Sequence, residues 1–183
     1  MRVVDILIPS AWAVFWVYWL AAALLTKVTR IRSTHGIGIR LALIVVVVVL
    51  VRSGVLGGHG TAVHAAWMQG TGLAMCAAGF ALAVWARAHL GRNWGTPMSE
   101  KVEPELVTSG PYRLIRHPIY SGFILAGIGT AFATNLALFA VVAVVSAYFV
   151  YAGVVEERTM LRLFPDAYPL YKGSTTMFVP FLF

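Results

Sequence analysis

The sequence predicts an all-α, polytopic membrane protein, and three observations support this class. Apolar residues make up 60% of the 183 residues and charged residues only 11%, with a mean hydropathy of +0.81. A water-soluble globule of this size does not need so many apolar residues. The apolar residues form long uncharged runs, and basic residues gather near the ends of these runs. About 20 apolar residues in a helix cross the roughly 30 Å of a bilayer core, so we predict a single membrane domain with about five spans.

The first predicted span is Ile6 to Leu25, which carries no charge. It is long, is followed by a lysine and an arginine, and lacks a small-residue cleavage site, so we expect a mature span and not a signal peptide. It also holds an aromatic cluster, which could form a ligand cage but which we expect to pack against lipid or at the interface. The cluster consists of Trp12, Phe15, Trp16, Tyr18 and Trp19.

The second and third predicted spans are Ile39 to Leu56 and about Thr61 to Ala88. The second contains a run of valines, which is acceptable as helix because a backbone in lipid must satisfy its own hydrogen bonds. The third contains Gly70, Gly72 and Gly79. Small residues allow two helix backbones to approach closely in a membrane, so we expect this helix to have a tightly packed neighbour.

Residues 89–117 form the longest polar segment, and a loop of this length is usually functional. Two further apolar runs follow, Ile119 to Phe132 and Leu136 to Val155, and the short break between them predicts a helical hairpin. From Glu156 we expect an amphipathic helix and then an interfacial tail. The predicted organisation is therefore three N-terminal spans in 1–88, a core that forms the cofactor pocket in 89–172, and the tail in 173–183.

Most basic residues fall on one side of this topology. The positive-inside rule then puts the amino terminus outside and the carboxyl terminus and the active site in the cytoplasm. The net charge of +7 is scattered singly along the chain, which favours contact with anionic lipid headgroups, at about 1 kcal/mol per residue, over nucleic acid. Only Arg2 and Arg52 fall on the opposite side. The predicted inner residues are Lys27, Arg30, Arg32, Arg40, Arg87, Arg92, Lys101, Arg113, Arg116, Arg158, Arg162 and Lys172.

The densest polar stretch is GPYRLIRHPIYSG, residues 110–122. Pro118 suits the first turn of a helix, so His117 should lie at or just before the start of the fourth span. A helix amino terminus favours anions, and Arg116, His117 and Tyr120 are predicted to border a pocket for a carboxylate or phosphate. The alternative is that both nearby arginines, Arg113 and Arg116, anchor the cytoplasmic membrane face and that the histidine caps the helix.

Glu156 and Glu157 follow the apolar hairpin, where we expect the end of a helix. The helix dipole disfavours negative charge there, and no cation lies three or four residues further on. They need partners from elsewhere in the chain. Because the hairpin returns to its starting level, Arg113 or Arg116 is predicted to reach them, and acidic residues at a membrane boundary are candidates for function.

Three motifs occur in order along this part of the chain: HLGRNW, then ELVTSGPYRLIRHPIYSG, then EERTMLRLFPDAYPLYK after the hairpin. Together they resemble the isoprenylcysteine carboxyl methyltransferase and phospholipid methyltransferase family of small membrane enzymes, over about Leu90 to Lys172. The resemblance implies an S-adenosylmethionine-dependent methyltransferase that releases S-adenosylhomocysteine. It also implies a lipophilic acceptor from the bilayer: a prenylcysteine-like carboxylate, another lipophilic acid or a phospholipid amine.

The resemblance also implies site residues. A carboxylate acceptor would be oriented by Arg92 or Arg162, whereas an amine or phenol would pass a proton to a glutamate such as Glu156. Because Glu157 has no local partner, we expect Glu157→Gln to abolish cofactor binding and leave the fold intact. The cofactor-binding residues are predicted to be Glu105, Leu106, Val107, Tyr112, Arg116, His117, Tyr120, Glu156, Glu157, Tyr168 and Tyr171.

Two alternatives stay open. A sterol-type reductase shares the pattern of arginine, histidine, proline, tyrosine and glutamate but uses NADPH, and a non-catalytic membrane binding factor could retain the same fold. No metal is predicted, because His59, His64 and His89 lack a metal-ligand spacing and Cys76 is the only cysteine. The sequence predicts no oligomeric state.

Overall fold

The computed structural model describes residues 3–24, 29–32, 34–53, 60–94, 99–101 and 105–180. The predictions for Arg2, Leu25, Lys27 and His59 lie outside the described residues, as does the end of the predicted tail at 181–183. All statements on structure below refer to the described part of the chain.

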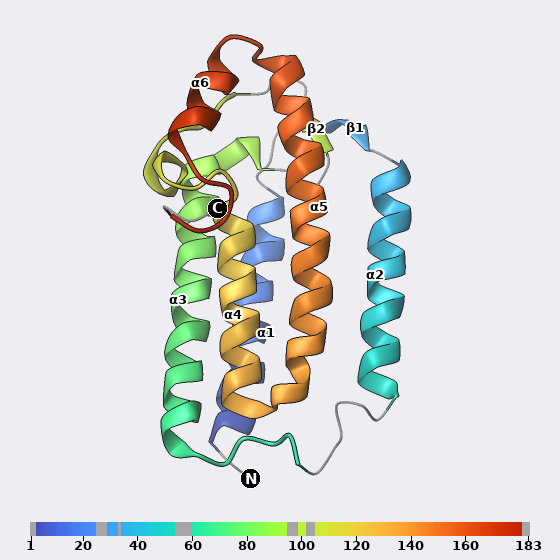
Figure 1. Cartoon of the computed structure of the whole chain (residues 1–183), viewed down its shortest axis with the longest axis vertical. Helices are drawn as coiled ribbons and strands as arrows, with labels where there is room; N and C mark the ends of the chain where they lie inside the picture. The colour runs from blue at the N-terminus through green and yellow to red at the C-terminus, as the bar shows by residue number, and fades with distance from the viewer. Residues whose placement is uncertain are drawn as a thin grey trace.

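Five helices form an elongated bundle (Figure 1). They are α1 (Val4–Ala23), α2 (Thr34–Arg52), α3 (Ala66–Leu90), α4 (Pro118–Thr134) and α5 (Phe139–Leu163). Each helix overlaps one of the predicted apolar runs, so the predicted helical class is confirmed, although the helix ends differ from those of the runs and residues 54–56 of the second run lie outside the described residues. Figure 1 shows α2 at the edge of the bundle, next to α5, while α3 and α4 pack side by side.

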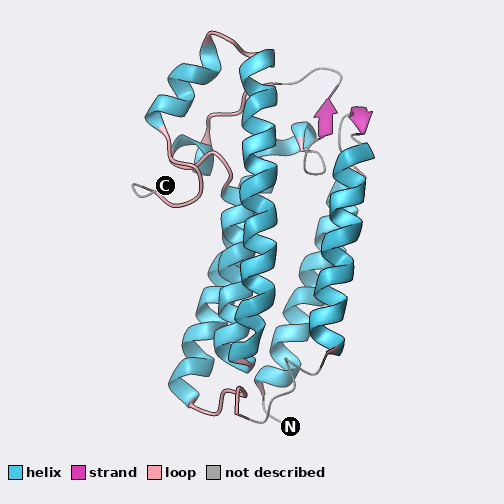
Figure 2. Cartoon of the chain, turned by 45° about the vertical axis from the view of Figure 1, so that its right-hand side comes forward, coloured by secondary structure: helices cyan, strands magenta, loops and turns pink. Residues whose placement is uncertain are grey.

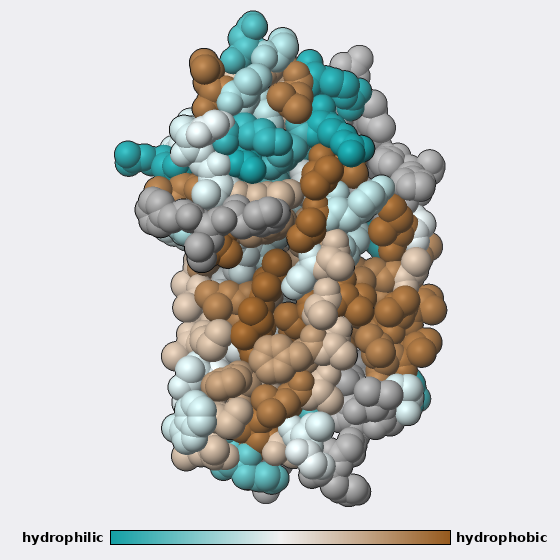
Figure 3. Space-filling view, in the orientation of Figure 1, coloured by the Kyte–Doolittle hydropathy of each residue, from teal (hydrophilic) through white to brown (hydrophobic). Residues whose placement is uncertain are grey.

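The lengths of the apolar helices are those of an integral membrane protein. Val4–Ala23, Ala66–Asn93 and Leu136–Leu163 are each long and apolar enough to cross a bilayer, whereas Gly38–Leu50 and Pro118–Thr134 are shorter apolar helices. Apolar side chains face outward along the bundle and form the apolar belt in Figure 3. The number of spans and the side on which each terminus lies stay predictions.

One end of the bundle, which we call the polar pole, carries the chemistry-bearing segments. It contains α6 (Ala167–Ser174) and the 3-10 turns η2 (Gly91–Asn93) and η3 (Gly110–Arg113), and hydrophilic residues gather there in Figure 3. A third 3-10 turn, η4 (Leu136–Leu138), joins α4 to α5 at the other end.

Two short strands at the polar pole were not predicted. β1 (Thr29–Arg32) pairs antiparallel with β2 (Ser99–Lys101), as Figure 2 shows. The strands join the loop between α1 and α2 to the long polar segment. Four-residue and three-residue strands carry too few alternating residues to be recognised in a polar sequence.

The helix of the last predicted span does not end near Val155, because α5 continues to Leu163. Glu156 and Glu157 therefore lie inside a helix and not at its end. The helix has no reason to stop where its apolar stretch stops, since the next residues also favour helix. It ends just before Pro165, which disfavours helical geometry in the residue that precedes it, and α6 begins two residues later.

The closest helix contact is a seam of small residues between α3 and α4. A Cβ atom added to Gly79 would lie 2.5 Å from both the Gly122 carbonyl oxygen and the Ala126 backbone nitrogen. Gly72 meets Ala133 and Gly129 in the same way, so the predicted close contact is confirmed for Gly72 and Gly79. Gly70, by contrast, is exposed and has no atom within 4 Å of such a Cβ.

We predict that Gly79→Ala destabilises the protein by about 1–3 kcal/mol, because the added methyl group pushes two backbones apart. The matched control is Gly70→Ala on the same helix, which should be neutral or stabilising by up to about 1 kcal/mol through helix propensity. Thermal unfolding of the two variants in detergent measures the difference. Equal melting temperatures for both variants would contradict a tight seam.

Candidate active site

A buried cluster of charges joins α5 to the start of α4. Arg116 Nε donates to Glu157 Oε1 at 2.6 Å, and Lys172 Nζ lies 2.5 Å from Glu157 Oε2. Glu157 is only 5% exposed. The prediction that an arginine of residues 110–122 reaches the double glutamate is confirmed for Arg116, while Arg113 is exposed.

The same cluster fastens the C-terminal segment onto the bundle. Arg116 Nη1 donates to the carbonyl oxygens of Thr175 and Lys172, and the Arg116 and His117 backbone N–H groups donate to Thr176 and Met177 at 2.9 and 3.1 Å. Met177 and Phe178 are buried. The tail that was predicted to be interfacial therefore packs into the core up to Phe178, because the backbone before α4 offers it hydrogen-bond partners.

Glu156 faces a different set of groups from its neighbour Glu157. Tyr120 Oη donates to Glu156 Oε1 at 2.5 Å, and His117 Nδ1 lies 3.5 Å from Glu156 Oε2. The His117 and Tyr120 rings are stacked with centroids 5.5 Å apart, and Tyr120 stacks in turn on Phe149 at 4.6 Å. A carboxylate therefore lies at the edge of an aromatic stack.

His117 precedes α4 directly, as predicted, and contacts both glutamates. Its Nε2 atom lies 3.6 Å from Glu157 Oε1, is buried, and has no hydrogen-bond partner in the described part of the chain. Gly153 leaves room for the ring, because a Cβ atom there would lie 3.2 Å from Nε2. Burial opposes the charged imidazolium, but the contacts with Glu156 and Glu157 outweigh burial, so the pKa of His117 is raised.

Three tyrosines of the polar pole remain protonated phenols at neutral pH. Burial, together with nearby negative charge, raises the pKa of Tyr112 and Tyr168 and raises the pKa of Tyr171 to about 12. Tyr171 Oη donates to the Tyr112 carbonyl oxygen at 2.8 Å and so joins α6 to η3. As protonated phenols, the three tyrosines are poor bases.

These residues border a cavity of about 840 Å³ that has one polar end. Two of its polar lining residues contact each other, because Asn93 Nδ2 donates to Glu105 Oε2 at 2.9 Å. All of the predicted cofactor residues except Glu157 line the cavity, namely Glu105, Leu106, Val107, Tyr112, Arg116, His117, Tyr120, Glu156, Tyr168 and Tyr171.

The cavity does not include the two arginines that were predicted to orient an acceptor. Arg92 and Arg162 are exposed and do not line it, and Arg162 donates to Thr159 at 3.2 Å. Each directly precedes a lining residue in the sequence, since Arg92 is followed by Asn93 and Arg162 by Leu163. Their predicted catalytic role stays a prediction.

The sequence analysis missed the contribution of the first two helices. Trp12, Trp16 and Trp19 of α1 and Leu43 and Ile44 of α2 line the cavity, so the pocket is not formed by the C-terminal half alone. The expectation that the aromatic cluster packs against lipid or at the interface is wrong for Phe15 and Trp19, which are buried, whereas Trp16 and Tyr18 are exposed. The spacing of the three tryptophans, four and three residues, places them on one helix face, and this signal could have found them.

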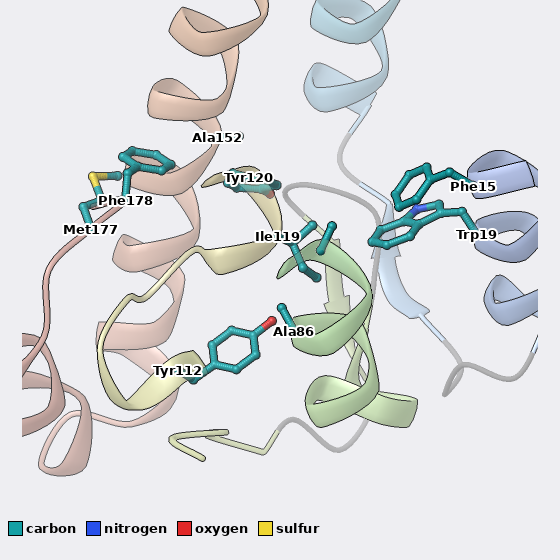
Figure 4. Packing of buried hydrophobic residues seen from close by; sticks show 10 residues of the cluster. Phe15, Trp19, Ala86, Tyr112, Ile119, Tyr120, Ala152, Met177 and Phe178 are labelled. Atoms are coloured by element: carbon teal, nitrogen blue, oxygen red, sulfur yellow. The ribbon is translucent and has the colours of Figure 1, made fainter. Parts of the chain in front are cut away.

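Figure 4 shows how the buried residues converge from distant parts of the chain. Phe15 and Trp19 come from α1, while Ile119 and Tyr120 come from the start of α4. Met177 and Phe178 approach from the tail, and the three groups belong to one core cluster.

Among the described residues, no group of histidine, cysteine and acidic side chains could hold a metal ion.

The long apolar helices, with ionisable groups gathered at one end of the bundle, define an integral membrane protein. The chain belongs to the phospholipid methyltransferase family, whose sequence profile matches residues 67–167, more than half of the chain. The matched region includes α3, α4, α5 and the polar segment between α3 and α4.

Two individual relatives of the chain are also named as methyltransferases. The chain is 35% identical to methanethiol S-methyltransferase 1 of Bradyrhizobium diazoefficiens over 44% of this chain and 28% of the relative. It is 30% identical to protein-S-isoprenylcysteine O-methyltransferase B of Arabidopsis thaliana over 63% of this chain and 61% of the relative. The chain thus spans less than two thirds of either relative.

A solved structure has the same fold. It is the eukaryotic intramembrane Ras methyltransferase, isoprenylcysteine carboxyl methyltransferase, which superposes with a TM-score of 0.57 at 23% identity. The match covers 83% of this chain and 55% of that chain.

We predict that Glu157→Gln destabilises the fold by about 3–5 kcal/mol, because it leaves Arg116 and Lys172 without their buried carboxylate. This replaces the expectation from the sequence that the variant folds normally. Glu156→Gln is the control, since the 27% exposed side chain can still accept from Tyr120. Denaturant unfolding in detergent compares the two, and a Glu157→Gln midpoint equal to that of the wild type would refute the prediction.

The raised pKa of His117 predicts how stability changes with pH. The folded state binds this proton more tightly than the unfolded state, so the contribution is complete below the unfolded pKa of about 6.5. It is lost as the pH rises through the higher folded pKa. Melting temperatures of the wild type should therefore fall from mildly acidic to alkaline pH, and those of His117→Gln should fall less. Parallel curves for the two proteins would exclude His117 as the source of the pH dependence of stability.

Proposed function

We propose that the protein is an S-adenosylmethionine-dependent methyltransferase that modifies a lipophilic acceptor in the membrane. The observation that carries this proposal is the cavity, which combines a polar end with an extended apolar lining. Its volume of about 840 Å³ is within the range of small-molecule sites. Membership of the phospholipid methyltransferase family supports the reaction type.

The side chains at the polar end fit the cofactor. S-adenosylmethionine, when bound, supplies an electrophilic methyl group on a cationic sulfur atom. Glu156 and the Tyr120–Phe149 stack suit a cation, because a carboxylate and aromatic faces both attract positive charge. His117 Nε2 is a buried polar atom without a hydrogen-bond partner in the described residues, and it would suit the carboxylate of the methionyl group.

The segment before η3 would hold the adenosine part. Glu105 is oriented by Asn93, whose Oδ1 atom is buried and lacks a partner within the described residues. Leu106 and Val107 line the same wall and offer backbone groups as well as apolar surface. Tyr168 and Tyr171 of α6 cover this end of the cavity from the tail side.

The rest of the lining supports an apolar acceptor. Besides the α1 tryptophans and the two α2 residues, it contains Val141, Val142 and Val145 of α5. The aliphatic side chains among them cannot stabilise a buried charge or an unpaired polar group. The acceptor would therefore carry an apolar chain along this lining and its nucleophilic atom at the polar end.

The protein contributes mainly alignment and exclusion of water. Holding two reactants in line provides effective molarities of about 10⁵ to 10⁸ M in well-oriented systems, and a dry cavity strengthens the field of Glu156. A carboxylate acceptor needs no base. An amine acceptor would release a proton that the carboxylate of Glu156 could take.

Ligand binding and methyl transfer test this proposal. Calorimetric titration of detergent-purified protein should give binding of S-adenosylmethionine and S-adenosylhomocysteine but not of NADPH. Glu156→Gln should weaken binding of the cationic ligand, because it removes the charge nearest the aromatic stack. Asp166→Asn, which removes an exposed carboxylate outside the cavity, is the matched control.

Transfer itself is measured by incubating the wild type in lipid extract with a methyl-labelled donor. Label should enter the organic phase. Binding of NADPH in place of the methyl donor would support the reductase alternative, and failure to bind either ligand would support a non-catalytic membrane factor.

A further inference from the structure

Arg87 is a buried cation near the end of α3 and is only 4% exposed. Its Nη2 donates to the Ala22 carbonyl oxygen at 2.7 Å, and its Nη1 donates to the Gly91 carbonyl oxygen at 2.8 Å. Ala22 lies in the last turn of α1, where carbonyl groups lack partners within the helix and carry the negative end of the dipole. Arg87 therefore caps α1 and joins it to the turn after α3.

The guanidinium also faces two tryptophans of the cavity wall. Its Cζ atom lies 4.3 Å from the centroid of the Trp94 ring and 6.0 Å from that of Trp19. The two indoles contact each other edge to face, with centroids 5.7 Å apart. Both rings line the cavity next to Asn93, and a cation over an aromatic face fixes the orientation of that face.

Arg87 makes no ion pair with the described acidic residues and does not itself line the cavity. A buried charge without a carboxylate is costly, and an apolar side chain of the same size would pack at lower cost. Simple packing does not explain an arginine here. What the arginine provides is a planar fork of donors that can bind two carbonyls from different elements at once.

We propose that Arg87 is a positioning residue for the polar end of the cavity. It holds the carboxyl end of α1 against the η2 turn and thereby fixes Trp19 and Trp94 as a wall beside Asn93 and Glu105. The nature of the ligand rests on the proposed methyltransferase function, whereas the order of the wall does not depend on it.

The test compares Arg87→Met and Arg87→Lys with Arg52→Met, which removes an exposed arginine at the far end of α2. Arg87→Met should weaken S-adenosylhomocysteine binding about tenfold or more, because the wall loses its support. Arg87→Lys should restore part of the affinity, since an ammonium can bind one of the two carbonyls. Arg52→Met should bind like the wild type.

Near-ultraviolet circular dichroism of the ligand-free proteins reports the order of the tryptophans separately. The Arg87→Met spectrum should lose tryptophan intensity at temperatures well below unfolding, and the Arg52→Met spectrum should match the wild type. An unchanged spectrum together with wild-type affinity in Arg87→Met overturns the proposal. The proposal is also overturned if Arg87→Lys loses as much melting temperature and as much affinity as Arg87→Met does.

The two proposals fail in different ways. If the wild type does not bind S-adenosylhomocysteine, the proposed function fails, and the ligand-free spectra decide the role of Arg87. A reduced tryptophan signal in Arg87→Met then supports the ordering of the wall, and an unchanged signal refutes it.

Discussion

The buried carboxylate of Glu157 is the contact on which the polar pole depends. It binds a residue that precedes α4 and a lysine of α6, so one side chain of α5 joins three segments that are distant in the sequence. A charge so deeply buried is tolerable only when its partners are in place. The arrangement of the tail over the cavity therefore depends on the helical hairpin having closed.

The bundle divides into a tight part and an open part. On one side the α3–α4 seam brings backbones into direct contact through glycine and alanine. On the other side large aromatic and branched residues of α1, α2 and α5 keep the helices further apart and leave the cavity between them. The tight seam provides a rigid wall, because small residues have no side-chain freedom to lose and few ways to rearrange.

The sequence predicted the helices and the ionisable residues of the cavity lining because both leave local signals. Apolar runs of span length locate the helices, and the motif around His117 together with Glu156 locates the polar end. The sequence did not predict that α5 continues to Leu163, because hydropathy marks where lipid ends and not where a helix ends. The sequence also did not predict the hydrogen bond from Arg87 to the Ala22 carbonyl oxygen. The two residues are 65 positions apart in the chain, and a backbone acceptor has no sequence signature.

The His117 ring lies within 3.6 Å of both glutamates. It therefore contacts Glu156, which lines the cavity, and Glu157, which binds Arg116 and Lys172. A positive ligand beside Glu156 would compete with the His117 imidazolium for that carboxylate. The His117 ring would then bind its proton less tightly. Loss of the proton changes the charge balance around Glu157, where Arg116 and Lys172 hold the tail. If a cationic ligand binds beside Glu156, its binding and the docking of the tail are thermodynamically linked, and each alters the equilibrium of the other by the same factor.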